Sequence, residues 1–252
     1  MNEISIIVPF YDKDSDLVGR MAGRLESLSF DREIIFVDDR EDKSTPIEVP
    51  GCAMVSYEGN RGLFEARRAG FNASHGKYIW FMDVDDFPLD ITQNVIDDIY
   101  STDYQVVCFN NYLDGKSSFR RIPDERYVKI TPENRMHLYY KCFFRQVWCA
   151  IYSRDVIASV YKDVPYYPKF FMYEDIFLNA LIFSRIDRVR TRTEYIYNYG
   201  YKEKSISGEC ISSLMSKLKE SEPKFDVKRY SEFIERIFNE WIALQKVNPE
   251  GS

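Results

Sequence analysis

The chain has 252 residues, of which 45% are hydrophobic and 29% charged, a balance typical of a globular protein large enough to bury a full core. Its formal net charge of -6 excludes the broad basic surface that nucleic-acid binding requires, so we expect no nucleic-acid partner. The five cysteines include no CxxC pair, which gives no basis for a zinc knuckle or a disulfide framework. No signal peptide and no run of 18 apolar residues is visible, and we expect a cytoplasmic protein with reduced thiols.

Strands alternate with helices in the first 90 residues. Apolar, often β-branched runs predict strands over residues 4–9, 33–37, 52–57 and 78–82. Apolar residues at helical spacing predict helices over residues 16–28 and 63–73. This alternation predicts a mostly parallel central sheet in an α/β sandwich.

The pattern is less regular after residue 90. We expect helices over residues 91–100, from Thr131 onward, and over 173–183, 209–220 and 226–246. Strands are expected over residues 105–109, 146–152 and 188–199, and residues 117–130 read as a hairpin or loop. These elements predict one domain over residues 1–208, whose pattern changes between residues 1–90 and 91–208, and a C-terminal helical extension over residues 209–252.

Carboxylates follow directly behind the strand expected at residues 78–82. Asp83, Asp85 and Asp86 come at the point where a parallel sheet delivers side chains to a ligand crevice. Carboxylate oxygens are ligands of Mg²⁺ or Mn²⁺, which bridge one or two acids to substrate phosphates. The same spacing recurs at Asp12 and Asp14, so the position behind a buried strand favours Asp83 and Asp85 as ligands, whereas Asp86 is expected to be structural.

Several motifs occur in an order that resembles glycosyltransferase family 2, the inverting enzymes of GT-A fold. They are Ile6-Ile7-Val8-Pro9-Phe10-Tyr11, Ile35-Phe36-Val37-Asp38-Asp39, Asn60-Arg61-Gly62-Leu63-Phe64-Glu65-Ala66-Arg67-Arg68-Ala69-Gly70, and Gly76-Lys77-Tyr78-Ile79-Trp80-Phe81-Met82-Asp83-Val84-Asp85-Asp86. The likeness is dense over about the first 90 residues. It continues more thinly through residues 147–154 and 173–177.

The resemblance implies that residues 1–208 form a GT-A-like catalytic domain, a three-layer sandwich with a nucleotide-binding half over residues 1–90 and an acceptor half over residues 91–208. It also implies a role for each matching residue. Pro9 and Tyr11 would line the nucleobase pocket, Asp39 would accept a hydrogen bond from the base, and Arg67 would lie near the nucleotide. Asp83 would contact the ribose or the metal, and Asp85 would bind the metal that holds the diphosphate. Asp175 would be the general base.

Two further residues are candidates for acceptor binding. Trp148 either forms a platform for an acceptor sugar or packs in the core, and Glu174 lies beside the candidate base. Glu174 and Asp175 are also typical of an ordinary helix N-terminus, where acids are favoured. One departure from the family pattern affects the base pocket, because Asp38-Asp39 is followed by Arg40-Glu41-Asp42 instead of Gly-Ser.

The predicted function is transfer of a sugar from a nucleoside-diphosphate sugar, with uridine favoured, to an acceptor hydroxyl. The acceptor would be a saccharide or a lipid-linked saccharide in polysaccharide or glycan assembly, and Mg²⁺ or Mn²⁺ would be the cofactor. The alternative is a non-catalytic nucleotide-sugar binding module, and a Mg²⁺-dependent phosphatase ranks below it. The apolar face expected on the helix at residues 226–246 would pack on the domain or on a second subunit, or would contact the inner face of the membrane.

Overall fold

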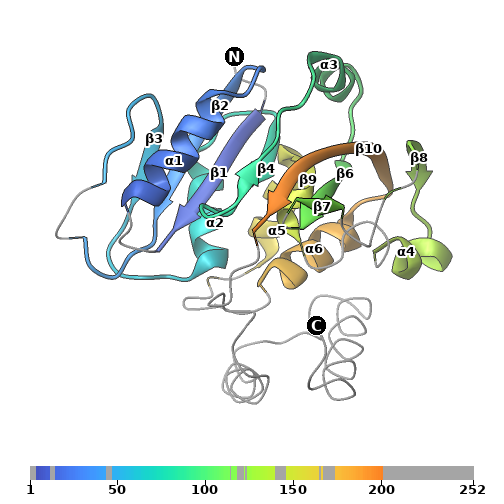
Figure 1. Ribbon diagram of the computed structural model, residues 1–252. Coiled ribbons are helices and arrows are strands. Elements are labelled where there is room, and N and C mark those ends of the chain that lie inside the picture. Colours follow the sequence, from blue (N-terminus) through green and yellow to red (C-terminus); the bar gives the residue numbers. More distant parts are fainter. Residues whose placement is uncertain are drawn as a thin grey trace, which may run out of the picture.

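The structure of the chain, a computed structural model, describes residues 4–11, 15–43, 47–113, 115–117, 122, 124–139, 146–164, 166 and 174–200 (Figure 1). The expected helices at residues 209–220 and 226–246, and with them the C-terminal extension, lie outside the described residues. None of the helices in the described ranges has an apolar stretch long enough to cross a membrane.

One mixed sheet runs through the described part of the chain. Its strands are β1 (Ile4–Phe10), β2 (Arg32–Asp38), β3 (Ala53–Ser56), β4 (Tyr78–Phe81), β5 (Phe87–Pro88), β6 (Val106–Leu113), β7 (Lys116–Ser117), β8 (Arg126–Lys129), β9 (Ala150–Ser153) and β10 (Arg188–Tyr199). The strand order is β3-β2-β1-β4-β9-β6-β10-β5, with β7 added to β6 and β8 added to β10. Strands from residues 1–90 and from residues 91–208 therefore share a single sheet.

Most of the long strands run in one direction. The pairs β1–β2, β1–β4, β2–β3 and β6–β10 are parallel. Strand β9 is antiparallel to both β4 and β6, so it separates two parallel groups that point the same way. The predicted mostly parallel sheet is confirmed, and the antiparallel insertion of β9 is a feature that strand–helix alternation did not predict.

Helices cover both faces of this sheet (Figure 1). They are α1 (Ser15–Glu26), α2 (Leu63–Ala73), α3 (Gln93–Ser101), α4 (Pro132–Leu138), the 3-10 helix η2 (Val147–Cys149), α5 (Arg154–Asp163) and α6 (Glu174–Arg185). The strand expected over residues 146–152 is wrong in its first half, because η2 precedes β9 there. Helix α5 was not expected from the sequence.

Side chains of β1 alternate between two hydrophobic cores, as the period-two geometry of a strand requires. Ile6 and Val8 pack in the core that contains residues of α1 and α3. Ile7 packs in the core that contains residues of α2, α5 and α6. Two cores on the two faces of one sheet make the predicted three-layer sandwich.

Helix α2 lies very close to the sheet. A Cβ atom added to Gly70 would meet Ile7 Cγ2 at 2.4 Å and Val37 Cγ2 at 2.9 Å, distances that real Cβ contacts do not show. Glycine therefore permits the close approach of α2 to β1 and β2. This approach determines where Arg67, one turn earlier on α2, meets the end of β4.

Candidate functional site at the carboxyl edge of the sheet

The parallel strands β1, β2 and β4 end at the same edge of the sheet, where ligands of α/β proteins bind. Tyr11 follows β1, Asp39 follows β2, and Asp83 lies two residues beyond the end of β4. Tyr11 is 59% exposed, whereas Pro9 is buried. The structure thus brings the residues predicted for nucleotide and metal binding to one edge.

Asp39 is held in place by three hydrogen-bond donors. Its Oδ1 accepts hydrogen bonds from the Tyr57 hydroxyl at 2.8 Å and the Arg61 N–H at 2.7 Å, and its Oδ2 accepts one from the Gly62 N–H at 3.0 Å. Burial raises the pKa of Asp39, although these donors and the charge of Lys43 oppose the shift. An ionised carboxylate offers about four acceptor positions, so about one remains, on Oδ2.

Tyr57 is a site residue that the sequence did not single out. It lies one residue beyond the end of β3, and its ring is covered by the Arg61 guanidinium at 4.1 Å. Burial, followed by the neighbouring Asp39, raises the pKa of Tyr57, so its hydroxyl keeps the proton that it donates. The sequence could have indicated Tyr57 only by its place at the end of a predicted strand. Because tyrosine is common in this chain, that place alone is weak evidence for a site residue.

The departure from the family pattern at Arg40 has a local structural explanation. Arg40 folds back on Asp38, with Nε–Oδ1 at 2.9 Å and Nη2–Oδ2 at 2.8 Å. Both residues are 4% exposed, and this bidentate contact occupies the carboxylate of Asp38. Of the two adjacent acids, Asp39 is therefore the one held by the loop that leads into α2.

The segment after β4 is a tight turn in which the Asp86 N–H donates to the Asp83 carbonyl at 3.2 Å. The Asp83 side chain is 27% exposed and the Asp85 side chain is half-buried. Burial and then the nearby charge of Asp85 raise the pKa of Asp83, while Arg67 opposes the shift. The two acids therefore lie close enough to repel each other.

Asp86 belongs to the interior, as expected for a structural role. It is 1% exposed, and its Oδ2 accepts a hydrogen bond from the Tyr197 hydroxyl at 2.8 Å. Its Oδ1 accepts one from the Gly200 N–H at 3.2 Å. Both partners lie at the end of β10 or directly after it.

Arg67 joins the acidic turn to the first residue of α6. Its Nη2 donates to Asp83 Oδ1 at 2.9 Å and its Nη1 donates to Glu174 Oε1 at 2.8 Å. Arg67 is 1% exposed and Glu174 is 5% exposed. Burial alone would lower the pKa of Arg67, but the carboxylates of Asp83, Glu174 and Asp175 raise it. One arginine side chain thus connects the candidate metal ligand Asp83 with Glu174, the residue next to the candidate base.

The two candidate acceptor-binding residues are buried in this structure. Glu174 is engaged by Arg67, and burial raises its pKa while Arg67 opposes the shift. Trp148 is 3% exposed and stacks on Tyr197 at 4.1 Å and on Tyr199 at 5.6 Å between ring centroids. Of the two earlier alternatives for Trp148, the packing role matches this environment, and the roles in acceptor binding stay predictions.

The donor set at the end of β4 fits a hard divalent cation. Asp83 uses only Oδ1 in its contact with Arg67, and within the described part of the chain its Oδ2 forms no hydrogen bond. No group of three or more His, Cys, Asp or Glu residues that could hold a metal occurs in the described ranges. Mg²⁺ commonly takes one or two carboxylates and completes its shell with water and phosphate oxygens, so a pair of acids such as Asp83 and Asp85 is compatible with this mode of binding.

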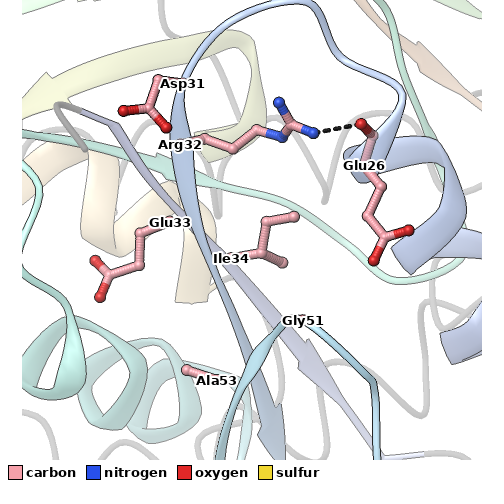
Figure 2. Close-up of a pocket in the computed structure, with 7 residues that line it drawn as sticks. All are labelled: Glu26, Asp31, Arg32, Glu33, Ile34, Gly51 and Ala53. Atoms are coloured by element: carbon pink, nitrogen blue, oxygen red, sulfur yellow. Dashed lines mark hydrogen bonds between the residues drawn. The ribbon is translucent and has the colours of Figure 1, made fainter. Parts of the chain in front are cut away.

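A shallow pocket of about 340 Å³ lies at the opposite edge of the sheet, where β2 and β3 begin (Figure 2). Its lining residues are Glu26, Asp31, Arg32, Glu33, Ile34, Gly51 and Ala53. Figure 2 shows the Arg32 guanidinium turned toward Glu26, and it donates to the Glu26 carbonyl. None of the predicted site residues lines this pocket.

Solved structures share the fold of this chain. Residues 1–349 of S. aureus TarS in complex with UDP match with a TM-score of 0.64 and 16% identity, covering 81% of this chain and 61% of that chain. The same protein in complex with UDP-GlcNAc matches with a TM-score of 0.64 and 17% identity, over 83% and 61% of the two chains. The fold is that of the GT-A glycosyltransferases.

Sequence comparison narrows the class to a family. The sequence model described as Glycosyl transferase family 2 matches residues 5–160, and the chain belongs to that family. The uncharacterized glycosyltransferase EpsJ of Bacillus subtilis is 25% identical over 217 residues, which cover 81% of this chain and 62% of EpsJ. The uncharacterized glycosyltransferase YibD of Escherichia coli is 24% identical over 223 residues, covering 82% and 63%. The chain spans about three-fifths of the length of these relatives.

Proposed function

We propose that this chain is an inverting, metal-dependent glycosyltransferase that moves a sugar from a nucleoside-diphosphate sugar to an acceptor hydroxyl. The observation that carries the proposal is the pair of Arg67 contacts, 2.9 Å to Asp83 and 2.8 Å to Glu174. They connect Asp83, on the predicted donor side, with Glu174, the residue next to the predicted base Asp175. Family membership supports the same reaction class.

The donor would bind along the carboxyl edge of the sheet. Tyr11 and Pro9 would line the nucleobase pocket, and the remaining acceptor position of Asp39 would take one N–H of the base. Uracil presents one ring N–H, whereas guanine presents two adjacent donors, so this count favours a uridine nucleotide. The named ligands of the TarS structures, UDP and UDP-GlcNAc, agree with this choice.

Asp83 and Asp85 would hold Mg²⁺ or Mn²⁺. The cation would supply positive charge to the diphosphate, which becomes more negative as it leaves. Because two neighbouring acids repel each other here, the site is suited to a cation. Arg67 neutralises only part of this negative charge, since it is shared with Glu174.

Asp175 would act as the general base. It would accept the proton of the acceptor hydroxyl while the hydroxyl oxygen forms a bond to the anomeric carbon. The bond from that carbon to the diphosphate oxygen breaks, and the electron pair leaves with the nucleoside diphosphate. One displacement on the face opposite to the leaving group inverts the anomeric centre. Glu174 is less suited to this role because its carboxylate is paired with Arg67.

We further infer that the acceptor is a saccharide or a lipid-linked saccharide, and that the reaction serves glycan or polysaccharide assembly in the cytoplasm. The curated relatives are named as glycosyltransferases without a stated acceptor. Contact with a membrane or a second subunit through residues 226–246 stays a prediction.

The test measures UDP release from UDP-sugars with Mn²⁺ across a panel of saccharide acceptors. Asp175→Asn should retain UDP binding in calorimetry and lower turnover by about 10²- to 10⁴-fold, the usual contribution of a general base. Asp155→Asn is the matched control, since Asp155 is an exposed acid in the first turn of α5. Asp85→Ala should abolish the Mn²⁺ dependence. Turnover at the parent rate in Asp175→Asn would refute the assigned role, and UDP-sugar binding without transfer to any acceptor would favour the binding-module alternative.

A further inference from the structure

Arg67 lies between two carboxylates that belong to different halves of the chain. Asp83 follows β4, 16 residues after Arg67, and Glu174 opens α6, 107 residues after it. The guanidinium is 1% exposed, so it has almost no surface to offer a nucleotide. A planar guanidinium can bridge two acids in a fixed geometry, which an ammonium group cannot do. The position of Arg67 thus suits a bridge better than direct binding to the substrate.

The charges on this bridge are not balanced. One guanidinium faces Asp83 and Glu174 through direct contacts, and Asp175 also attracts it. Asp83 in turn feels the negative charge of Asp85. A cation that binds Asp83 must therefore compete with Arg67 for the same carboxylate.

We propose that Arg67 is a positioning residue that couples cation binding at Asp83 to the placement of the first turn of α6. This inference rests on the proposed function. A cation bound to Asp83 weakens the hold of Arg67 on that acid and shifts the guanidinium toward Glu174. Helix α6 is then held more firmly when the donor side is loaded, and Asp175, the next residue on α6, is held with it.

The coupling has to be reciprocal, because binding free energies linked through one equilibrium affect each other equally. When the negative charge of Glu174 is removed, Arg67 pairs with Asp83 alone. It should then compete more strongly with a cation and weaken cation binding at Asp83. Removing the charge of Arg67 should strengthen cation binding, since a competing cation is gone. Opposite signs for two neighbouring buried substitutions distinguish coupling from simple damage to the site.

The experiment measures the affinity of the full chain for Mn²⁺ by calorimetry, without any nucleotide. Glu174→Gln should raise the Kd on the order of tenfold, because a unit charge acts over several ångströms in a protein of moderate effective dielectric constant. Arg67→Met should lower the Kd by a similar factor. Glu133→Gln is the matched control, since Glu133 is an exposed acid in the first turn of α4, and it should leave the Kd unchanged.

A second variant covers the case in which Arg67→Met does not fold, since it leaves Glu174 buried without a partner. The double variant Arg67→Met/Glu174→Gln removes the charge and its partner together, and it should bind Mn²⁺ more tightly than Glu174→Gln alone. Weaker binding in every variant, or no change in Glu174→Gln, would overturn the coupling. Failure of the parent protein to bind Mn²⁺ would instead refute the metal site of the proposed function.

Discussion

Asp86 offers a sharp test of the electrostatics at the acidic turn. Burial, followed by the charges of Asp83 and Asp85, raises its pKa to about 8 from the ordinary 3.8. Its two carboxylate oxygens already accept hydrogen bonds from Tyr197 and Gly200. We therefore expect Asp86 to be protonated at neutral pH in the folded protein without a bound metal. Asp86→Asn places an uncharged group of the same shape at this position.

The sign of the effect follows from proton binding. Between about pH 4 and pH 8 the folded chain binds a proton at Asp86 that the unfolded chain has lost, so the free energy of unfolding decreases as pH rises. One pKa unit corresponds to about 1.4 kcal/mol, so this one carboxyl contributes a loss of about 3 kcal/mol between about pH 5 and pH 7. The unfolding free energy stops decreasing above about pH 8, the pKa of Asp86 in the folded protein. In Asp86→Asn this contribution is absent.

The assay is urea unfolding of the parent and the variant over this pH range, with a chelator present to keep the acidic turn free of metal. As pH rises from about 5 to 7, the unfolding free energy of the parent should fall by about 3 kcal/mol relative to that of Asp86→Asn. Asp103→Asn is the control, because the Asp103 side chain is 82% exposed. A difference between parent and Asp86→Asn that does not change with pH would refute the raised pKa.

Two further substitutions test the packing and the base pocket. Gly70→Ala should lower the unfolding free energy by about 1–3 kcal/mol, because its Cβ would overlap Ile7. Gly23→Ala on α1 is the control, because a Cβ atom added there meets nothing within 4 Å, and it should leave the unfolding free energy unchanged or raise it. Urea unfolding measures both variants. Equal changes in unfolding free energy for Gly70→Ala and Gly23→Ala would contradict the close approach of α2. Tyr57→Phe removes the hydroxyl that donates to Asp39, and we expect a Kd for UDP on the order of tenfold higher in calorimetry, with about 1–3 kcal/mol lost from stability. An unchanged Kd would argue against Asp39 as the base-binding residue.

The positions of the acids relative to the strands could be predicted from local sequence. The apolar runs at residues 4–9, 33–37 and 78–82 correspond to β1, β2 and β4, because a run of buried residues ended by polar ones needs no distant partner to be recognised. The carboxyl edge then follows from parallel pairing. Asp39 and Asp83 were placed correctly at that edge for this reason.

The second half of the sheet was less accessible to such reasoning. Strand β9 is four residues long and runs against its neighbours, and its place between β4 and β6 depends on pairings with distant segments. Local apolar patterns do not encode strand direction or strand order. Helix α5, whose buried face consists of Val156, Ile157, Val160 and Tyr161, was missed beside it.

The sequence by itself determined the family, the alternation of strands and helices and the acids that end the strands. Only the tertiary structure separated the roles of neighbouring acids: Asp38 pairs with Arg40, Asp39 is held by Tyr57, and Asp86 turns inward to Tyr197. Only the tertiary structure also joined Asp83 to Glu174 through Arg67. The physical reason is that the charge and exposure of a carboxylate depend on partners up to 114 residues away, which packing alone brings within hydrogen-bond distance.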